Sequence, residues 1–272
     1  MSDGGVLIFT YDGSYHGILS AVFDAFVLKQ LPDEVYTFDD EEPGLFSVHV
    51  VETNRAHADR VENGIRKKLG PNAFRMVRNG FLYGGEGKEM AILRFLWVGF
   101  NEDPGVANRL ASPEAAPLYM MANAVVNEVV QMKGFVRFTD SGGALVSVIH
   151  PKHHVLPLLK DFFRARLRGE NFLIFDENHG AALFHAGDKT AIVPLEALEK
   201  PDSENDRFYR ELWKAYYKHI AIASRYNPTC RRTHMPKRFW NDLTEMEDEV
   251  QSPADRLFSL SEGEKVEKIA VV

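Results

Sequence analysis

The stretch Phe135–His154, which reads FVRFTDSGGALVSVIHPKHH, decides the fold class of this 272-residue chain. Two short apolar runs in it flank Asp140-Ser141-Gly142-Gly143, a sequence typical of a β-hairpin turn. A second pair of apolar runs, Phe172–Phe175 and Ala181–Phe184, flanks another polar loop. Between the two pairs, the segment from Pro151 to about Arg168 has the periodicity of a helix. The pattern predicts a ββαββ unit, an antiparallel sheet with a helix on one face.

Outside this unit the sequence is mainly helical. Val6–Tyr11 predicts a buried strand, and Asp12-Gly13-Ser14 predicts a turn and the N-cap of a helix that ends near Gln30. One more strand is expected at Leu45–Val51. Four more helices are expected, at Ala56–Leu69, Lys88–Phe100, Pro117–Met132 and Asp206–Ser224. The predicted class is α+β. We expect a mainly helical region with edge strands (1–133), the ββαββ unit with a basic, aromatic C-terminal segment (134–245), and an acidic tail (246–272).

The charge is segregated along the chain, although the net charge is only −7. Residues 1–53 carry −9, residues 54–240 carry +8, and residues 241–272 carry −6. Between Arg207 and Arg238 there are nine basic residues and one acid, Glu211, interleaved with aromatic residues. Because local field rather than total charge attracts a polyanion, this segment favours nucleic acid binding.

Two parts of the basic segment lead to different expectations. In Phe208–Ser224 the rings recur at helical spacing, so we expect them to pack in the core. In Tyr226–Trp240, Pro228 and Pro236 interrupt the chain, so we expect a loop. The candidate nucleic-acid-binding residues lie on this loop, with the basic side chains on phosphates and Tyr226 or Trp240 stacked on a base: Tyr226, Arg231, Arg232, Lys237, Arg238 and Trp240.

Other features exclude several classes of protein. No apolar run approaches the roughly 18–20 residues that span a bilayer, and the N-terminus has no basic segment typical of a signal peptide, so we expect a cytoplasmic protein without a membrane partner. A single cysteine, Cys230, excludes an internal disulfide and a cluster held only by thiolates of this chain. We expect no metal and no cofactor.

Four residues are candidates for catalysis: Asp12, His150, Lys152 and His153. Asp12 follows a strand, where it is either a general base or metal carboxylate, or simply a turn residue that bonds its own backbone. If a helix begins at Pro151, His150 and His154 lie one turn apart and could share a metal or transfer protons. The alternative is that these histidines are surface or capping groups.

Several motifs together resemble a bacterial family described as probable DNA-metabolism proteins. They are, in order, Tyr11-Asp12-Gly13-Ser14 before an apolar helix, Gly134–Phe138, Pro151-Lys152-His153 with Val155-Leu156-Pro157, Asn227-Pro228, and Met235–Trp240. The resemblance covers about residues 6–245. It implies a role in DNA repair or modification, because such proteins are typically encoded beside a putative DNA-repair radical-SAM protein and are sometimes fused to a uracil-DNA glycosylase domain.

The resemblance implies partners rather than a reaction of this chain. A radical-SAM centre needs three cysteines for its cluster, and this chain has one. The leading hypothesis is therefore a DNA-binding partner protein that works with a separately encoded radical-SAM protein, and with a uracil-DNA glycosylase where one is present. The alternatives are an enzyme acting directly on DNA as a nuclease, glycosylase or base-processing activity, with Lys152 as a Schiff-base nucleophile, or a protein–protein adaptor that does not bind nucleic acid.

Overall fold

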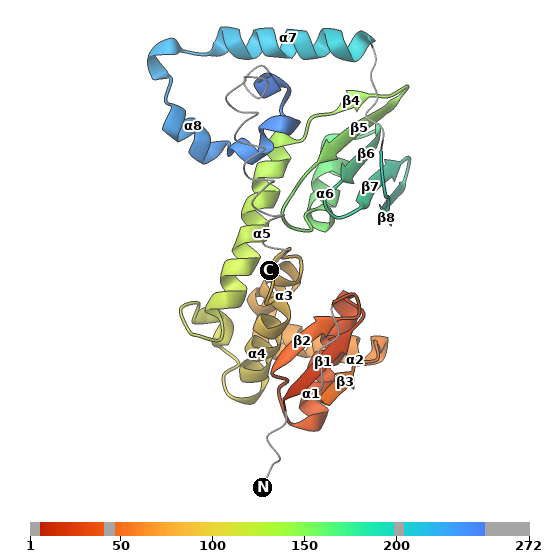
Figure 1. The fold of residues 1–272 in the computed structure, drawn as a ribbon, viewed down its shortest axis with the longest axis vertical. Coiled ribbons are helices and arrows are strands. Elements are labelled where there is room, and N and C mark those ends of the chain that lie inside the picture. Colours follow the sequence, from red (N-terminus) through yellow and green to blue (C-terminus); the bar gives the residue numbers. More distant parts are fainter. Residues whose placement is uncertain (1–5, 41–46, 199–203, 248–272) are drawn as a thin grey trace, which may run out of the picture. The chain divides into compact units, whose positions relative to one another are not determined.

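The computed structural model describes residues 6–40, 47–198 and 204–247, so the predicted acidic tail lies outside the described residues from position 248 onward. The chain divides into two compact units, coloured along the sequence in Figure 1. Unit 1 comprises residues 1–128 and 152–154, and unit 2 comprises residues 129–151 and 155–272.

Unit 1 contains a three-stranded parallel sheet with strand order β2-β1-β3. Its strands are β1 (Leu7–Tyr11), β2 (Glu34–Thr37) and β3 (Ser47–Val50). The predicted first strand and the strand near residue 48 are confirmed, whereas β2 was not expected, since it is only four residues long and is followed by an acidic, turn-forming sequence. Helix α1 (Tyr15–Leu28) connects β1 to β2 and begins as predicted at Ser14, whose hydroxyl accepts a hydrogen bond from the Gly17 amide at 2.9 Å.

The other elements of unit 1 are helical: α2 (Arg55–Gly64), a π-helical turn (Ile65–Leu69), α3 (Gly70–Phe81), α4 (Lys88–Asn101), a 3₁₀ turn (Val106–Asn108) and the first part of α5 (Ala116–Phe135). The sequence predicted α2 with the π-helical turn, α4 and α5. It did not predict the short 3₁₀ turn, and it did not predict α3, because Gly70-Pro71 indicated a break. The break is real but local. Gly70 has φ of +86°, which turns the chain, and Pro71 then occupies the first turn of a new helix, where its missing N–H is harmless.

Unit 2 contains a five-stranded sheet in the order β4-β5-β6-β7-β8. Its strands are β4 (Thr139–Asp140), β5 (Ala144–Ile149), β6 (Asn171–Asp176), β7 (Ala181–Ala186) and β8 (Lys189–Pro194). Both predicted hairpins form, as β4–β5 and β6–β7, and β8 extends the sheet by one strand that was not predicted. The α+β class is confirmed.

The sheet is mixed rather than wholly antiparallel, because β5 and β6 pair in parallel. Helix α6 (Leu156–Arg166) connects these two strands and returns the chain to the end of the sheet at which β5 started. A crossover of this kind makes its two strands parallel, which the order of elements in the sequence did not show. In the core between helix and sheet, the Phe163 ring of α6 lies against the Phe172 ring of β6, with ring centroids 6.5 Å apart, and both side chains are almost completely buried.

The C-terminal part of unit 2 is helical. Helix α7 (Glu204–Ile220) is followed by a 3₁₀ turn (Ala223–Arg225) and by α8 (Pro228–His234). Helix α8 turns back from the end of α7 in Figure 1. Two more 3₁₀ turns, Lys237–Asp242 and Thr244–Met246, come after it. Across residues 6–40, 47–198 and 204–247, no helix combines the length and the apolar character needed to cross a membrane.

Candidate nucleic-acid interface

Helix α7 presents a row of apolar and aromatic side chains to solvent. Tyr209 is 67% exposed, Tyr216 is 53% exposed and Ile220 is 53% exposed. The expectation that these rings pack in the core is therefore wrong. Helical spacing shows that side chains share one face, but it does not show that another element covers that face.

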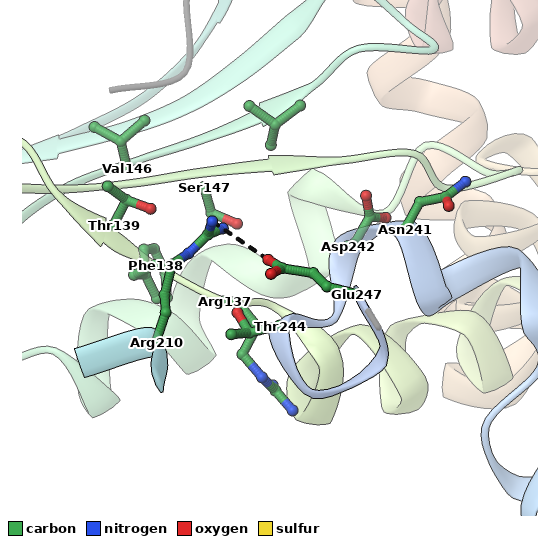
Figure 2. A pocket seen from close by; sticks show the side chains of 11 residues that line it. Arg137, Phe138, Thr139, Val146, Ser147, Arg210, Asn241, Asp242, Thr244 and Glu247 are labelled. Carbon is green, nitrogen blue, oxygen red and sulfur yellow. Dashed lines mark ion pairs between the residues drawn. The ribbon is translucent and has the colours of Figure 1, made fainter. Parts of the chain in front are cut away.

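The attachment of α7 is polar. Glu247 pairs with Arg210 at 3.3 Å and with Lys214 at 2.8 Å, and the Trp213 indole donates a hydrogen bond to Glu245 at 2.9 Å. Figure 2 shows the Arg210–Glu247 ion pair beside a small pocket that strand β5 also lines. Charged and hydrogen-bonding groups thus fix α7 through residues 244–247 and leave its apolar side chains outside the core.

The pocket in Figure 2 has a volume of about 50 Å³. Two arginines, Arg137 and Arg210, and two carboxylates, Asp242 and Glu247, are among its lining residues. The hydroxyl of Ser147, also in the lining, is buried without a hydrogen-bond partner among the described residues. Small volume and balanced charge make this pocket a poor site for a polyanion.

Residues 228–234 form helix α8 instead of the predicted loop. The Asn227 side chain caps this helix by accepting a hydrogen bond from the Cys230 amide at 3.0 Å, and Pro228 occupies its first turn. A proline at that position fits a helix, because the first amides have no partner within it. No residue of α8 is buried, so the helix lies on the surface.

The candidate residues on this segment have two different roles. Tyr226 is 65% exposed, and Arg232, Lys237 and Arg238 are exposed as well. Trp240, by contrast, is 7% exposed, and its indole donates a hydrogen bond to the Met235 carbonyl at 2.9 Å. Trp240 is therefore a packing residue in this structure, and the prediction that it stacks on a base is corrected.

Two of the predicted phosphate-binding residues contact Trp240. The Arg231 guanidinium lies 4.9 Å from the centre of its ring, and the Lys237 ammonium lies 5.5 Å from it. Arg231 is also hydrogen-bonded to the Met246 sulfur. The Arg231 contact joins α8 to the following 3₁₀ turn, whereas the Lys237 contact lies within that turn, so Arg231 contributes to the local packing.

The bend between α7 and α8 forms an open pocket of about 760 Å³, which we call the elbow pocket. Its lining residues are Ile220, Ala221, Ile222, Arg225, Tyr226, Asn227, Cys230 and Arg231. The charged residues among them are both arginines, so its lining is apolar and basic at once. Sequence reasoning did not include Ile220, Ile222 or Arg225 among the candidates, and only their joint exposure at the bend identifies them.

The four candidate catalytic residues are divided between the units. Asp12 lies in unit 1 at the end of β1, and its carboxylate accepts a hydrogen bond from the Ser14 amide at 3.0 Å. Burial acts to raise the pKa of Asp12, but hydrogen bonds from Ser14 and Thr53 outweigh it and lower the pKa below its ordinary value. Asp12 thus remains ionised and makes the contacts of a turn residue.

Lys152 and His153, also in unit 1, are held by the buried carboxylate of Glu128. It accepts hydrogen bonds from the Lys152 amide at 3.1 Å and from the His153 amide at 2.8 Å. Helix α6 begins at Leu156, so residues 150–154 are not helical. The expectation that His150 and His154 lie one helical turn apart is therefore wrong.

His150 belongs to unit 2, where its ring lies between two carboxylates. Nδ1 is 2.8 Å from Asp242 and Nε2 is 2.7 Å from Glu177. The hydrogen bond to Asp242, together with the charges of Asp242 and Glu177, raises the pKa of His150 above its ordinary value, although desolvation acts in the opposite direction. This arrangement stabilises the imidazolium and connects the end of β5 to two later turns.

Metal ligation has no support in the part of the chain that the structure describes. In that part, no three His, Cys, Asp or Glu side chains lie together as a metal site would require. The exposed rings and cations of α7 and α8 form the candidate interface of unit 2.

Comparison with known proteins identifies one family. No curated protein matches the chain. A family model described as "Domain of unknown function (DUF4130)" matches residues 86–245, which is more than half of the 272 residues. The matched part includes α4 to α8 and both elements that form the elbow pocket. The chain therefore belongs to the DUF4130 family.

Proposed function

We propose that this chain binds nucleic acid through α7 and α8 and acts as a partner protein in a DNA repair or modification system. A separately encoded radical-SAM protein would supply the radical chemistry, and a uracil-DNA glycosylase is a further proposed partner. The observation that carries this proposal is the elbow pocket, where apolar side chains and two arginines line one open surface.

Cations and exposed rings are the two components that single-stranded nucleic acid sites combine. Arg225, Tyr226 and Arg232 are all exposed, and acidic residues are scarce in this part of the sequence, since Glu211 is the only one between positions 207 and 238. Lysine and arginine neutralise phosphates and release counterions, which makes such binding salt-dependent. Base stacking contributes about 1–3 kcal/mol per base.

The test is fluorescence anisotropy of the purified protein with labelled DNA over a range of salt concentrations. If about four phosphates are neutralised, log Kd should change with log salt with a slope of magnitude roughly 3–4. The double variant Arg225→Glu/Arg232→Glu should flatten this slope. We choose these two arginines because Arg231 packs against Trp240, so its substitution would also disturb the fold.

Arg168→Glu is the matched control, because Arg168 is an exposed arginine in unit 2 beyond the end of α6. It should leave the slope as in the wild type. Equal slopes for the wild type and the double variant would remove the α7–α8 surface from the proposal. Absence of DNA binding at low salt would overturn it.

A protein–protein adaptor is the second candidate, and the exposed aliphatic side chains of α7 favour it. Leu212 is 55% exposed and Ile220 is 53% exposed, and aliphatic side chains on a surface helix are typical of a partner interface. In that case a complex with the radical-SAM protein should survive nuclease treatment, and Leu212→Ser should weaken it while the salt slope of DNA binding stays unchanged.

A further inference from the structure

The elbow pocket differs from a surface that recognises the base sequence of duplex DNA. A duplex presents phosphates and the edges of its bases, because the base faces are stacked on one another. The edges are recognised by side chains with paired donors and acceptors. In the elbow pocket Asn227 is the one carboxamide among the described lining residues, and its side-chain oxygen already accepts the Cys230 amide hydrogen bond.

The lining suits the face of a base instead. Ile220, Ile222 and Tyr226 are all more than half exposed, so they offer apolar contact area without any rearrangement of the core. A pocket of about 760 Å³ is in the range of sites that accommodate small organic groups. Only a base that has left its stack can present its face to such a pocket.

Charge complementarity supports the same occupant. Arg225 lies between Ile222 and Tyr226 in the sequence and lines the pocket with them, so a cation is present where the backbone of a bound nucleotide would pass. Arg232 follows on the exposed helix α8. No described residue of the lining is acidic, and a phosphate next to the pocket would therefore meet no repulsion from it.

We propose that the elbow pocket holds one unpaired nucleobase by its face, so that the protein selects single-stranded over duplex nucleic acid. The pocket provides apolar contact for the base, and Arg225 and Arg232 contact the adjoining phosphates. This inference rests on the proposed function, since it names the form of nucleic acid that the same surface binds.

Cys230 makes the site directly observable. It is the only cysteine of the chain, it is exposed, and it lines the elbow pocket. The rate at which a maleimide labels Cys230 therefore reports occupancy of this pocket, because no other thiol of the chain reacts. A base in the pocket should reduce this rate, whereas phosphate contacts elsewhere should leave it unchanged.

The experiment compares four probes of about 15 nucleotides: single-stranded DNA, single-stranded RNA, a blunt DNA duplex, and the same duplex with one bulged thymine. For each probe, anisotropy gives Kd and maleimide labelling gives protection of Cys230. We expect both single strands and the bulged duplex to bind more tightly than the blunt duplex and to slow labelling several-fold. A difference between DNA and RNA would show which sugar the site prefers.

Tyr226→Ser tests the stacking contact, and Phe184→Ser is its control. Both rings are exposed, at 65% and 41%, so neither change should unfold the protein, and Phe184 lies on β7. Tyr226→Ser should weaken single-strand binding by about 5- to 100-fold with little effect on the blunt duplex. Phe184→Ser should match the wild type for every probe.

The outcomes separate this inference from the proposed function. Binding of all probes with equal affinity and without protection of Cys230 would overturn the inference while nucleic acid binding stands. Binding of no probe at low salt would overturn both. Protection of Cys230 by a partner protein, with no effect of any oligonucleotide, would show that the pocket is a protein interface.

Discussion

The indole nitrogen of Trp213 lies 2.9 Å from a carboxylate oxygen of Glu245 and donates a hydrogen bond to it. The same carboxylate accepts a hydrogen bond from Arg137 at 2.6 Å, so one acidic side chain connects α7 to the segment that leads into β4. The Glu245 side chain is only 4% exposed. A buried polar contact therefore helps to fix the position of α7 and of its aromatic face.

Replacement of this carboxylate should loosen α7. Glu245→Ala removes the acceptor for both Trp213 and Arg137 and should lower the free energy of unfolding by about 1–3 kcal/mol. Urea denaturation measures the loss, and acrylamide quenching of tryptophan fluorescence should increase. Glu211→Ala is the control, because Glu211 is an exposed acid on the same helix that pairs with Lys214 at 3.2 Å. A loss of equal size in both variants would contradict this account of how α7 is held.

Stability at neutral pH should depend on His150. Its pKa is raised in the folded protein by Asp242 and Glu177, so the imidazolium contributes stability that is complete below the unfolded pKa of about 6.5. That contribution is lost as the pH rises through the folded pKa. The midpoint of urea unfolding should therefore fall in the wild type as the pH rises above about 6.5, and His150→Gln should remove that part of the pH dependence. Parallel pH profiles for the two proteins would show that the two carboxylates do not stabilise the imidazolium.

Trp240 and Tyr226 should respond in opposite ways to substitution. Trp240→Ala removes a buried indole that Arg231 and Lys237 pack against, which leaves a cavity. It should destabilise the protein by about 3–5 kcal/mol. Tyr226→Ala changes an exposed ring and should alter stability by less than about 0.5 kcal/mol. Thermal unfolding distinguishes the two. Equal stability of Trp240→Ala and the wild type would show that the indole is dispensable for packing.

Gly84 should not tolerate a side chain. A Cβ atom there would collide with the backbone carbonyl of Lys152, and a backbone atom cannot move aside as a side chain can. We expect Gly84→Ala to destabilise unit 1 by about 1–3 kcal/mol or more. Gly134→Ala is the opposite case, because no atom lies within 4 Å of its added Cβ and Gly134 is in helix α5. It should stabilise the protein by up to about 1 kcal/mol, as measured by urea denaturation.

Local signals predicted the regular elements well. Ser14 was expected to cap the first helix and does so, and Lys88 was expected to begin a helix and does so. These features depend on residues that are neighbours in the sequence, such as a hydroxyl three positions before the amide it caps. Prolines were misread twice, at Pro71 and Pro228, because a proline that ends one element also fits the first turn of the next helix.

By itself, the sequence determined the α+β class, the two hairpins of unit 2, and the concentration of basic and aromatic residues between Arg207 and Trp240. Only the tertiary structure decided which of those rings are buried: Trp240 is covered, while Phe208, Tyr216 and Tyr226 are exposed. The physical reason is that burial depends on what packs against a side chain. For α7 that was decided by ion pairs and hydrogen bonds to residues 245–247, far along the chain from most of the helix. The elbow pocket likewise follows from the tertiary structure, because it lies where the bend between α7 and α8 leaves apolar side chains open to solvent.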